Sequence, residues 1–535
     1  MKAQREANVV AFLAEVSARA GARPALIAGE RVVSFAELWE RVRRTGAGLR
    51  AAGLAPGERV VLMVPMSIEL YVCLLAVLSI GAVGVFVDPW IGRRQIAAFS
   101  VFAEPAAWIG IGKSHALRVL EPALRRIRLT VTTGSRFARW PARVTLRELE
   151  RAPASGELAP VTDDDPALVT FTTGSSGTPK GANRTHGFLA AQHEALAAEF
   201  PYRDDDVDMP MFPVFALNNL ATGIPSVIPD IDFAHVAEAD AVGLLSAMRA
   251  RGVTTATASP PFFDRLIEHV AAGRAPAPDL RRILTGGAPV SDRQLAAWKR
   301  ALPDTQIVVV YGSTEAEPIA HVTAEERLAA SGARPGFCAG RPSARVRTRL
   351  VRIADGPIAL GSDGWRAWEL APGEPTGIGE LVVAGAHVGR DYYRNARAVE
   401  ENKIRDADGS VWHRMGDTGS FDEHGRFWLV GRVHSTIRRA GQLVHPQLVE
   451  QAALGEDAEI ARVAAVGVRD ARLGERVLVL VESAGGAAVE TRVAARLREA
   501  ALPCDELRVS ATALPVDPRH NSKIDYAALR ARYSS

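Results

Sequence analysis

Residues 171–181 read FTTGSSGTPKG, and this stretch decides the fold that we predict. Its glycines at positions 174, 177 and 181 permit tight turns with positive φ. Its hydroxyl groups can donate to phosphate oxygens, and Lys180 adds a positive charge. The mainly apolar residues 167–171 predict a buried strand, so the loop leaves a strand end, where α/β proteins place ligands. The stretch therefore predicts a loop that wraps a polyphosphate.

This loop differs from the P-loop of nucleoside triphosphatases. That motif needs Lys followed directly by Ser or Thr, whereas here Pro179 precedes Lys180 and Gly181 follows it. A flexible Gly/Ser connector is the alternative interpretation of such a composition. The Thr-Pro-Lys-Gly ending and the strand in front favour a phosphate-binding loop.

Length and composition exclude several classes of protein. A chain of 535 residues is too long for one ordinary core and predicts a large α/β body with at least one further domain. A hydrophobic share of 47% with 23% charged residues is typical of soluble globular proteins. The net charge of +3 and the lack of a basic stripe argue against a nucleic-acid partner. The three cysteines lack CxxC spacing, so we expect no disulfide framework, no zinc site and a reducing cytoplasm.

Two apolar stretches need a membrane check. The N-terminal residues 1–21 carry Arg and Glu between their apolar positions and predict an amphipathic helix rather than a signal peptide. Residues 71–87 are uncharged, but they are short for a span and contain two glycines, so we expect a helix end and a buried strand. The sequence thus predicts no transmembrane segment.

The N-terminal half alternates strand and helix patterns. Ser34 and Glu37 form a capping-box pattern for a helix that starts near Phe35. Strand 59–64, helix 68–80 and strand 82–87 follow in order, which predicts a parallel sheet. We interpret residues 144–160 as a surface excursion and the acidic run 203–208 as solvated turn residues.

Two later stretches follow predicted strands and carry chemistry. After strand 280–285, the residues Gly287, Ala288 and Pro289 are small enough for a flat ring to approach the backbone, although a plain βα turn would look the same. After strand 307–310 comes Tyr-Gly-Ser-Thr-Glu, residues 311–315. Glu315 is our candidate for holding Mg²⁺, because this ion prefers oxygen ligands.

These stretches, in this order, resemble the signatures of the adenylate-forming superfamily, which includes acyl-CoA synthetases, nonribosomal peptide synthetase adenylation domains and luciferases. The resemblance covers nearly the whole chain. It implies an α/β fold, with an N-terminal AMP-binding body over residues 1–431 and a small, mobile α+β lid over residues 432–535. His434 occupies the hinge, where the family commonly has Asp or Lys; a pH-sensitive hinge is the alternative to a plain polar pivot, which we favour.

The resemblance also implies a role for each matching residue. Tyr311 packs near adenine, Thr314 meets the α-phosphate, Asp417 accepts hydrogen bonds from the ribose hydroxyls, and Arg432 binds ribose or phosphate. Lys523 bridges the carboxylate and ATP. The predicted catalytic residues are Thr314, Glu315 and Lys523. The predicted nucleotide-binding residues are Thr172, Thr173, Gly174, Ser175, Ser176, Gly177, Thr178, Lys180, Gly287, Ala288, Pro289, Tyr311, Gly312, Ser313, Asp417 and Arg432.

The family's reaction activates a carboxylate with ATP and Mg²⁺, and the second step distinguishes its members. Residues 226–230, 412–417 and 518–524 are similar to the β-lactone synthetases of bacterial olefin biosynthesis, whose substrate is a long-chain β-hydroxy acid. A fatty acyl-CoA ligase or acyl-AMP ligase is the alternative. Phe215 and Ala216 stand where CoA ligases commonly have a His, which disfavours that alternative.

We name Phe215, Ala216 and Asn218, in the apolar segment 211–228, as places to look for an acyl pocket. A binding protein that has lost catalysis is disfavoured by the intact Glu315, Asp417 and Lys523.

Overall fold

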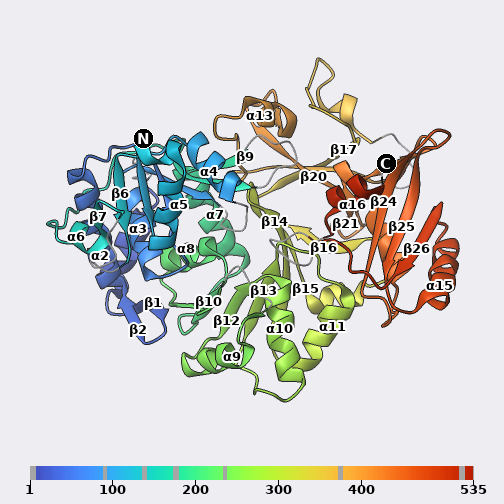
Figure 1. The fold of residues 1–535 in the computed structure, drawn as a ribbon, viewed down its shortest axis with the longest axis horizontal. Helices are drawn as coiled ribbons and strands as arrows, with labels where there is room; N and C mark the ends of the chain where they lie inside the picture. Colours follow the sequence, from blue (N-terminus) through green and yellow to red (C-terminus); the bar gives the residue numbers. More distant parts are fainter. Residues whose placement is uncertain are drawn as a thin grey trace.

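The computed structural model describes residues 8–87, 93–134, 141–172, 180–232, 238–370, 377–516 and 524–533. Of the predicted site residues, positions 173–178 and Lys523 lie outside these ranges. The described chain forms three sheets with helices packed against them, a mixed α/β fold with parallel-rich sheets, as predicted (Figure 1). Figure 1 shows the C-terminal sheet at one end of the molecule and the N-terminal strands at the other.

The first sheet contains the strands on both sides of the glycine-rich stretch. Its order is β7-β6-β5-β3-β4-β8-β9, and all neighbours are parallel except β8 and β9. The strands are β3 (Arg59–Met63), β4 (Val83–Val87), β5 (Ala107–Gly110), β6 (Leu129–Thr132), β7 (Val144–Thr145), β8 (Pro166–Thr172) and β9 (Lys180–Thr185). Thr172 and Lys180 face each other in the β8–β9 hairpin, so the glycine-rich stretch joins two antiparallel strands.

Helices α2 (Phe35–Ala51) and α3 (Ile68–Ser79) confirm two local predictions. Ser34 and Glu37 form the expected capping box, with each side chain bonded to the other residue's backbone N–H. Every residue of α3 except Glu69 is buried, which is the pattern of a helix enclosed on all sides. No helix within the described ranges is long and apolar enough to cross a membrane.

The second and largest sheet has a parallel and an antiparallel half. Its order is β17-β18-β20-β21-β16-β15-β14-β13-β12-β10-β11-β1-β2, with β19 beside β20, and the parallel half runs from β14 to β1. The strands are β1 (Pro24–Ala28), β2 (Arg31–Ser34), β10 (Asp208–Pro210), β11 (Ser226–Ile228), β12 (Thr255–Ala258), β13 (Arg282–Gly286), β14 (Gln306–Ser313), β15 (Ala316–Thr323), β16 (Phe337–Pro342), β17 (Arg347–Val351), β18 (Gly379–Ala384), β19 (Lys403–Arg405), β20 (Val411–Phe421) and β21 (Phe427–Arg432). The change of direction falls at the β14–β15 turn, which carries Glu315.

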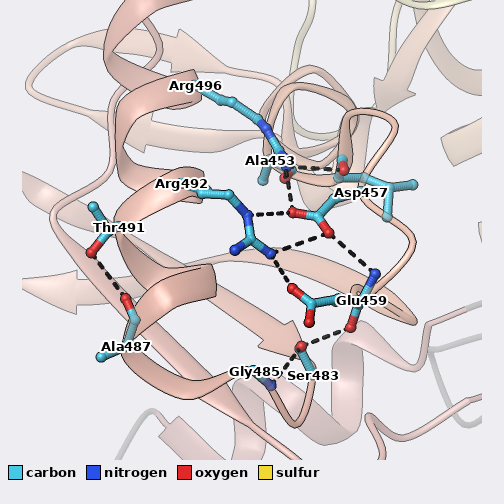
Figure 2. A network of polar contacts seen from close by, with 10 residues as sticks. Ala453, Asp457, Glu459, Ser483, Gly485, Ala487, Thr491, Arg492 and Arg496 are labelled. Carbon is cyan, nitrogen blue, oxygen red and sulfur yellow. Dashed lines mark hydrogen bonds and ion pairs between the residues drawn. The ribbon is translucent and has the colours of Figure 1, made fainter.

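The third sheet begins after the short helix η5 (Val433–Ser435). It comprises β22 (Ile437–Arg439), β23 (Gln442–Val444), β24 (Arg462–Asp470), β25 (Gly474–Glu482) and β26 (Glu506–Ser510), with α14 (Pro446–Leu454), α15 (Gly486–Glu499) and α16 (Tyr526–Tyr533). Figure 2 shows how Arg492 and Arg496 of α15 hold Asp457. These hydrogen bonds lower the pKa of Asp457 to about 2, so its carboxylate stays ionised and ties α15 to the segment before β24.

Two sequence-based interpretations were wrong in part. Asp206 and Asp208 of the acidic run are buried, with 1% and 0% of their surfaces exposed, whereas Asp204 and Asp205 are exposed as expected. Arg281 pairs with Asp206, and Thr255 and Asn219 donate to Asp208. Distant partners that no local pattern reveals compensate for the burial of these two charges. Residues 144–160 are likewise only partly superficial, because they contribute β7 and the buried Leu146 and Leu149 of α6 (Leu146–Leu149).

Candidate active site

The Tyr-Gly-Ser-Thr-Glu stretch forms the centre of the candidate site. Tyr311, Gly312 and Ser313 end β14, Thr314 and Glu315 make the turn, and β15 returns antiparallel to it. Gly312 is required by packing, because a Cβ there would lie 2.9 Å from the carbonyl oxygen of Ala316. The hydroxyl of Ser313 accepts a hydrogen bond from the N–H of Glu315 at 3.2 Å. This hydrogen bond stabilises the turn, and Glu315 lies at the carboxyl end of the parallel strand β14.

The Gly-Ala-Pro turn lies next to Tyr311. Parallel β13 and β14 pair Gly286 with Val310, so residues 287–289 leave the sheet level with Tyr311. Gly287 has φ +78°, and Gly287 and Pro289 are exposed. A side chain at position 286 would meet the carbonyl oxygen of Val310 at 2.5 Å, which explains a glycine at the start of the turn. This position beside Tyr311 is compatible with the predicted adenine contact.

Asp417 brings two of the predicted residues together. The hydroxyl of Tyr311 donates to Oδ2 of Asp417 at 2.7 Å, and Nε of Arg432 lies 2.8 Å from Oδ1. Asp417 lies inside strand β20 and pairs with Arg432 of β21. Three stretches of sequence separated by up to 121 residues therefore converge on one carboxylate.

Glu315 is surrounded by residues that the sequence analysis did not single out. Tyr392 donates to Oε1 of Glu315 at 2.9 Å. Desolvation by itself would raise the pKa of Glu315, but positive charge at His413 and Lys403 and the Tyr392 hydrogen bond together lower it. Near neutral pH this charge comes from Lys403, because burial lowers the pKa of His413 to about 3, while that of Lys403 falls only to about 8. Glu315 is therefore an ionised carboxylate that accepts a hydrogen bond from Tyr392 and is stabilised by the positive charge of Lys403.

The hairpin of β8 and β9, which we call the glycine-loop hairpin, lies beside the Glu315 turn. Arg184, in β9 only four residues after Lys180, is 7% exposed, and its Nε donates to the carbonyl oxygen of Thr314 at 3.2 Å. Desolvation raises the pKa of Glu317 to about 7, against the opposing effect of Arg184. Lys180 itself lies 3.9 Å from Glu401 of α13 (Ala396–Asn402). The hairpin and the Glu315 turn thus share one side of the site.

A small apolar cavity lies behind the site, with a volume of about 50 Å³. It lies between α1 (Ala11–Ala20), α3, α7 (His186–Glu199) and α8 (Pro213–Thr222), and is lined by apolar side chains such as Phe12, Leu75 and Leu217. Its polar lining residues are Gln192, His193 and Asn218. Nε2 of Gln192 donates to the carbonyl oxygen of Glu317 at 3.2 Å, which places the cavity one side chain away from the Glu315 hairpin.

Of the three positions named as places to look for an acyl pocket, Asn218 lines this cavity. Phe215 packs on the sheet side of α8 with Leu284 and Val310, and Ala216 belongs to another core cluster, so neither is among the lining residues. Helical geometry explains the difference, because neighbouring positions of a helix point in different directions.

Comparison with known proteins identifies the family. The AMP-binding enzyme family matches residues 13–393. The chain belongs to this family. It is 38% identical over 526 residues to an olefin beta-lactone synthetase of Stenotrophomonas maltophilia, covering 95% of this chain and 92% of the relative. It is 36% identical over 513 residues to an olefin beta-lactone synthetase of Xanthomonas campestris, covering 92% and 89%. The predicted family resemblance is confirmed, and this AMP-binding enzyme is an AMP-forming ligase.

Solved structures support the fold of this AMP-binding enzyme. An amide bond synthetase from Marinactinospora thermotolerans superposes with a TM-score of 0.79 at 24% identity, covering 98% of this chain and 100% of that one. The α/β architecture with a large N-terminal and a small C-terminal part is therefore shared.

Sequence reasoning missed Arg184, Tyr392, Lys403 and His413. Weak signals existed for two of them, because His413 lies in the block that contains Asp417 and Arg184 in the strand that starts at Lys180. Their interactions with Glu315 and Thr314 join positions 77 to 130 residues apart, which spacing along the chain does not reveal.

Proposed function

We propose that this enzyme adenylates a long-chain β-hydroxy acid and closes it to a β-lactone. The observation that carries the proposal is the small apolar cavity whose lining residue Gln192 donates to the carbonyl oxygen of Glu317 in the Glu315 hairpin. Its mainly apolar lining favours an aliphatic group over a polar one. The names of the relatives that cover most of the chain support the β-lactone product.

Adenylation activates a poor electrophile. One carboxylate oxygen of the acid attacks the α-phosphorus of ATP, the bond to the bridging oxygen breaks, and pyrophosphate leaves. Negative charge grows on the phosphoryl oxygens, and fixed positive charges and N–H donors lower the barrier by positioning and electrostatics. We assign these tasks to Lys523, to Thr314 and to the hydroxyls and amides of residues 172–178.

Lactone closure needs no second substrate. The β-hydroxyl oxygen attacks the activated carbonyl carbon, the hydroxyl loses its proton, and AMP leaves with the electron pair of the broken C–O bond. Both reacting groups belong to one molecule, so the encounter is intramolecular and needs only the correct conformation. An apolar cavity that held part of the alkyl chain would restrict the acid to such a conformation.

Glu315 fits a magnesium ion. It is an ionised carboxylate beside the glycine-loop hairpin, and one or two carboxylates are the usual protein contribution when Mg²⁺ also binds substrate phosphates. Bound there, Mg²⁺ would supply charge neutralisation at the phosphates. Asp417 and Arg432 would hold the ribose.

The two-part division at residues 431 and 432 belongs to the same proposal. A lid of residues 432–535 would carry Lys523 toward the nucleotide by turning about residues 432–434. In the described structure, Arg530 of α16 donates to the carbonyl oxygen of His434 at 2.8 Å. This contact involves the backbone of His434, which supports the plain pivot.

The test incubates the enzyme with ATP, Mg²⁺ and a long-chain β-hydroxy acid, with and without CoA. We expect a β-lactone and AMP in equal amounts, independent of CoA. A thioester that forms only in the presence of CoA would overturn this proposal and indicate an acyl-CoA ligase. No carboxylate-dependent release of pyrophosphate with any acid would indicate a binding protein without catalysis.

A further inference from the structure

The loop between β18 and α13, residues 385–395, touches both halves of the candidate site. On one side, the N–H of Gly389 donates to the carbonyl oxygen of Glu315 at 2.6 Å, and Val388 forms an antiparallel bridge with Ala316. On the other side, Tyr392 forms an antiparallel bridge with Ala182, and the N–H of Tyr393 donates to the carbonyl oxygen of Gly181 at 2.8 Å. One short loop therefore spans from the Glu315 turn to the strand that follows the glycine-rich stretch.

Tyr392 is the residue that joins these two contacts. Its backbone is paired with β9, while its hydroxyl donates to Oε1 of Glu315 at 2.9 Å. Only 5% of its surface is exposed. Because its backbone is fixed on the hairpin and its hydroxyl on the carboxylate, the length of the tyrosine side chain sets the distance between them.

Lys403 holds the tyrosine in place. Its ammonium group donates to the carbonyl oxygen of Gly389 and lies 5.0 Å from the centre of the Tyr392 ring. A cation over an aromatic face is attracted by the ring's quadrupole. Lys403 thus contacts both the backbone of the loop and the ring of Tyr392.

From this geometry we propose that Tyr392 is a positioning residue, which fixes the orientation of the Glu315 carboxylate relative to the glycine-loop hairpin. The proposal rests on the proposed role of Glu315 at the metal. Without the tyrosine hydroxyl, the Glu315 side chain can rotate freely. Metal binding must then fix its conformation, and this entropic cost weakens the binding of the metal.

The test compares Tyr392→Phe with Tyr393→Phe and Glu315→Gln. Tyr393 is a matched control, because it is the next residue of the same loop and its hydroxyl donates at 3.3 Å to the carbonyl oxygen of Ala103 instead. Two quantities are measured. One is the affinity for Mn²⁺ in the presence of a non-hydrolysable ATP analogue, by electron paramagnetic resonance. The other is the Mg²⁺ concentration that gives half-maximal carboxylate-dependent pyrophosphate exchange.

We expect Tyr392→Phe to weaken Mn²⁺ binding and to raise the half-saturating Mg²⁺ concentration, each roughly tenfold, which is the usual effect of a lost hydrogen bond to a charged group. The maximal rate at saturating Mg²⁺ should change less, and Tyr393→Phe should resemble the wild type in both measurements.

A loss of maximal rate and of thermal stability in Tyr392→Phe at an unchanged metal requirement would overturn the proposal, since Tyr392 would then only brace the loop. Unchanged Mn²⁺ affinity in Glu315→Gln would refute the metal role of Glu315 itself. A loss in Glu315→Gln with none in Tyr392→Phe would refute the positioning role alone. None of these Mn²⁺ measurements depends on the acid or on lactone closure.

Discussion

Tyr311 donates a 2.7 Å hydrogen bond to Asp417, 106 residues further along the chain, and thereby joins β14 of the parallel half of the large sheet to β20 of the antiparallel half. Asp417 is 7% exposed, and Arg432 holds its other oxygen. The two partners fix the orientation of the carboxylate that we propose to hold the ribose. We expect Tyr311→Phe to raise KM for ATP about tenfold, the cost of one hydrogen bond to a charge, with a smaller effect on kcat.

Tyr71→Phe is the control for removing a phenol hydroxyl. The hydroxyl of Tyr71 is buried and has no hydrogen-bond partner among the described residues. Its removal should leave KM for ATP unchanged. An equal KM in wild type and Tyr311→Phe would show that Asp417 does not depend on Tyr311 to bind the nucleotide.

Lys523→Ala should abolish carboxylate-dependent pyrophosphate exchange while the circular dichroism spectrum stays that of the wild type. Removing one group that stabilises transition-state charge costs roughly a hundredfold or more in rate. Lys113→Ala, at an exposed position of α5 (Gly112–Leu120), is the matched control and should exchange normally. Exchange at the wild-type rate in Lys523→Ala would remove this residue from the mechanism.

Leu217→Phe should shift the preference of the enzyme toward acids with shorter alkyl chains. The cavity has space for roughly three to five water-sized groups, and the larger side chain would fill part of it. The readout is kcat/KM for pyrophosphate exchange over a series of chain lengths. Leu266→Phe, which overpacks the separate core of α10 (Pro260–Ala271), controls for general strain. A uniform loss at all chain lengths would mean that the cavity holds no part of the substrate.

Asp206→Ala should lower the free energy of unfolding by roughly 3 kcal/mol, because it leaves the Arg281 guanidinium without its buried partner. We choose the lower end of the range for broken buried pairs, since Arg281 still reaches solvent. Asp205→Ala, one position away and exposed, should change the free energy by about 0.5 kcal/mol or less. Denaturant midpoints of the two variants test this difference, and equal midpoints would contradict it.

Glu450 should make the C-terminal part less stable as the pH rises. Desolvation raises its pKa to about 7, although Tyr526 of α16 and the N–H of Ala465 donate to it. Between about pH 4.5 and 7 the unfolded chain loses this proton while the folded chain keeps it, so the free energy of unfolding falls over that window. In Glu450→Gln this contribution disappears. The difference between the thermal midpoints of variant and wild type should therefore grow from pH 4.5 to 7 in favour of the variant, and a constant difference would refute the prediction.

Local sequence patterns correctly predicted α2, α3 and the pairing of β3 with β4. Ser34 with Glu37 placed the start of α2, the apolar run placed α3 in the core, and the strand-helix-strand order gave the parallel pairing of β3 and β4. The acidic run failed because burial of Asp206 and Asp208 depends on Arg281, Thr255 and Asn219, which lie 11 to 75 residues away.

The sequence by itself determined the family, the mixed α/β fold and the Tyr-Gly-Ser-Thr-Glu turn, because these depend on short motifs whose order along the chain is enough to recognise them. Only the tertiary structure decided that Tyr311 and Arg432 share Asp417, that Tyr392 and Lys403 lie near Glu315, and that a cavity lies between α1, α3, α7 and α8. Hydrogen bonds and electrostatic interactions depend on distance in space, and packed strands bring together side chains that the chain itself keeps far apart.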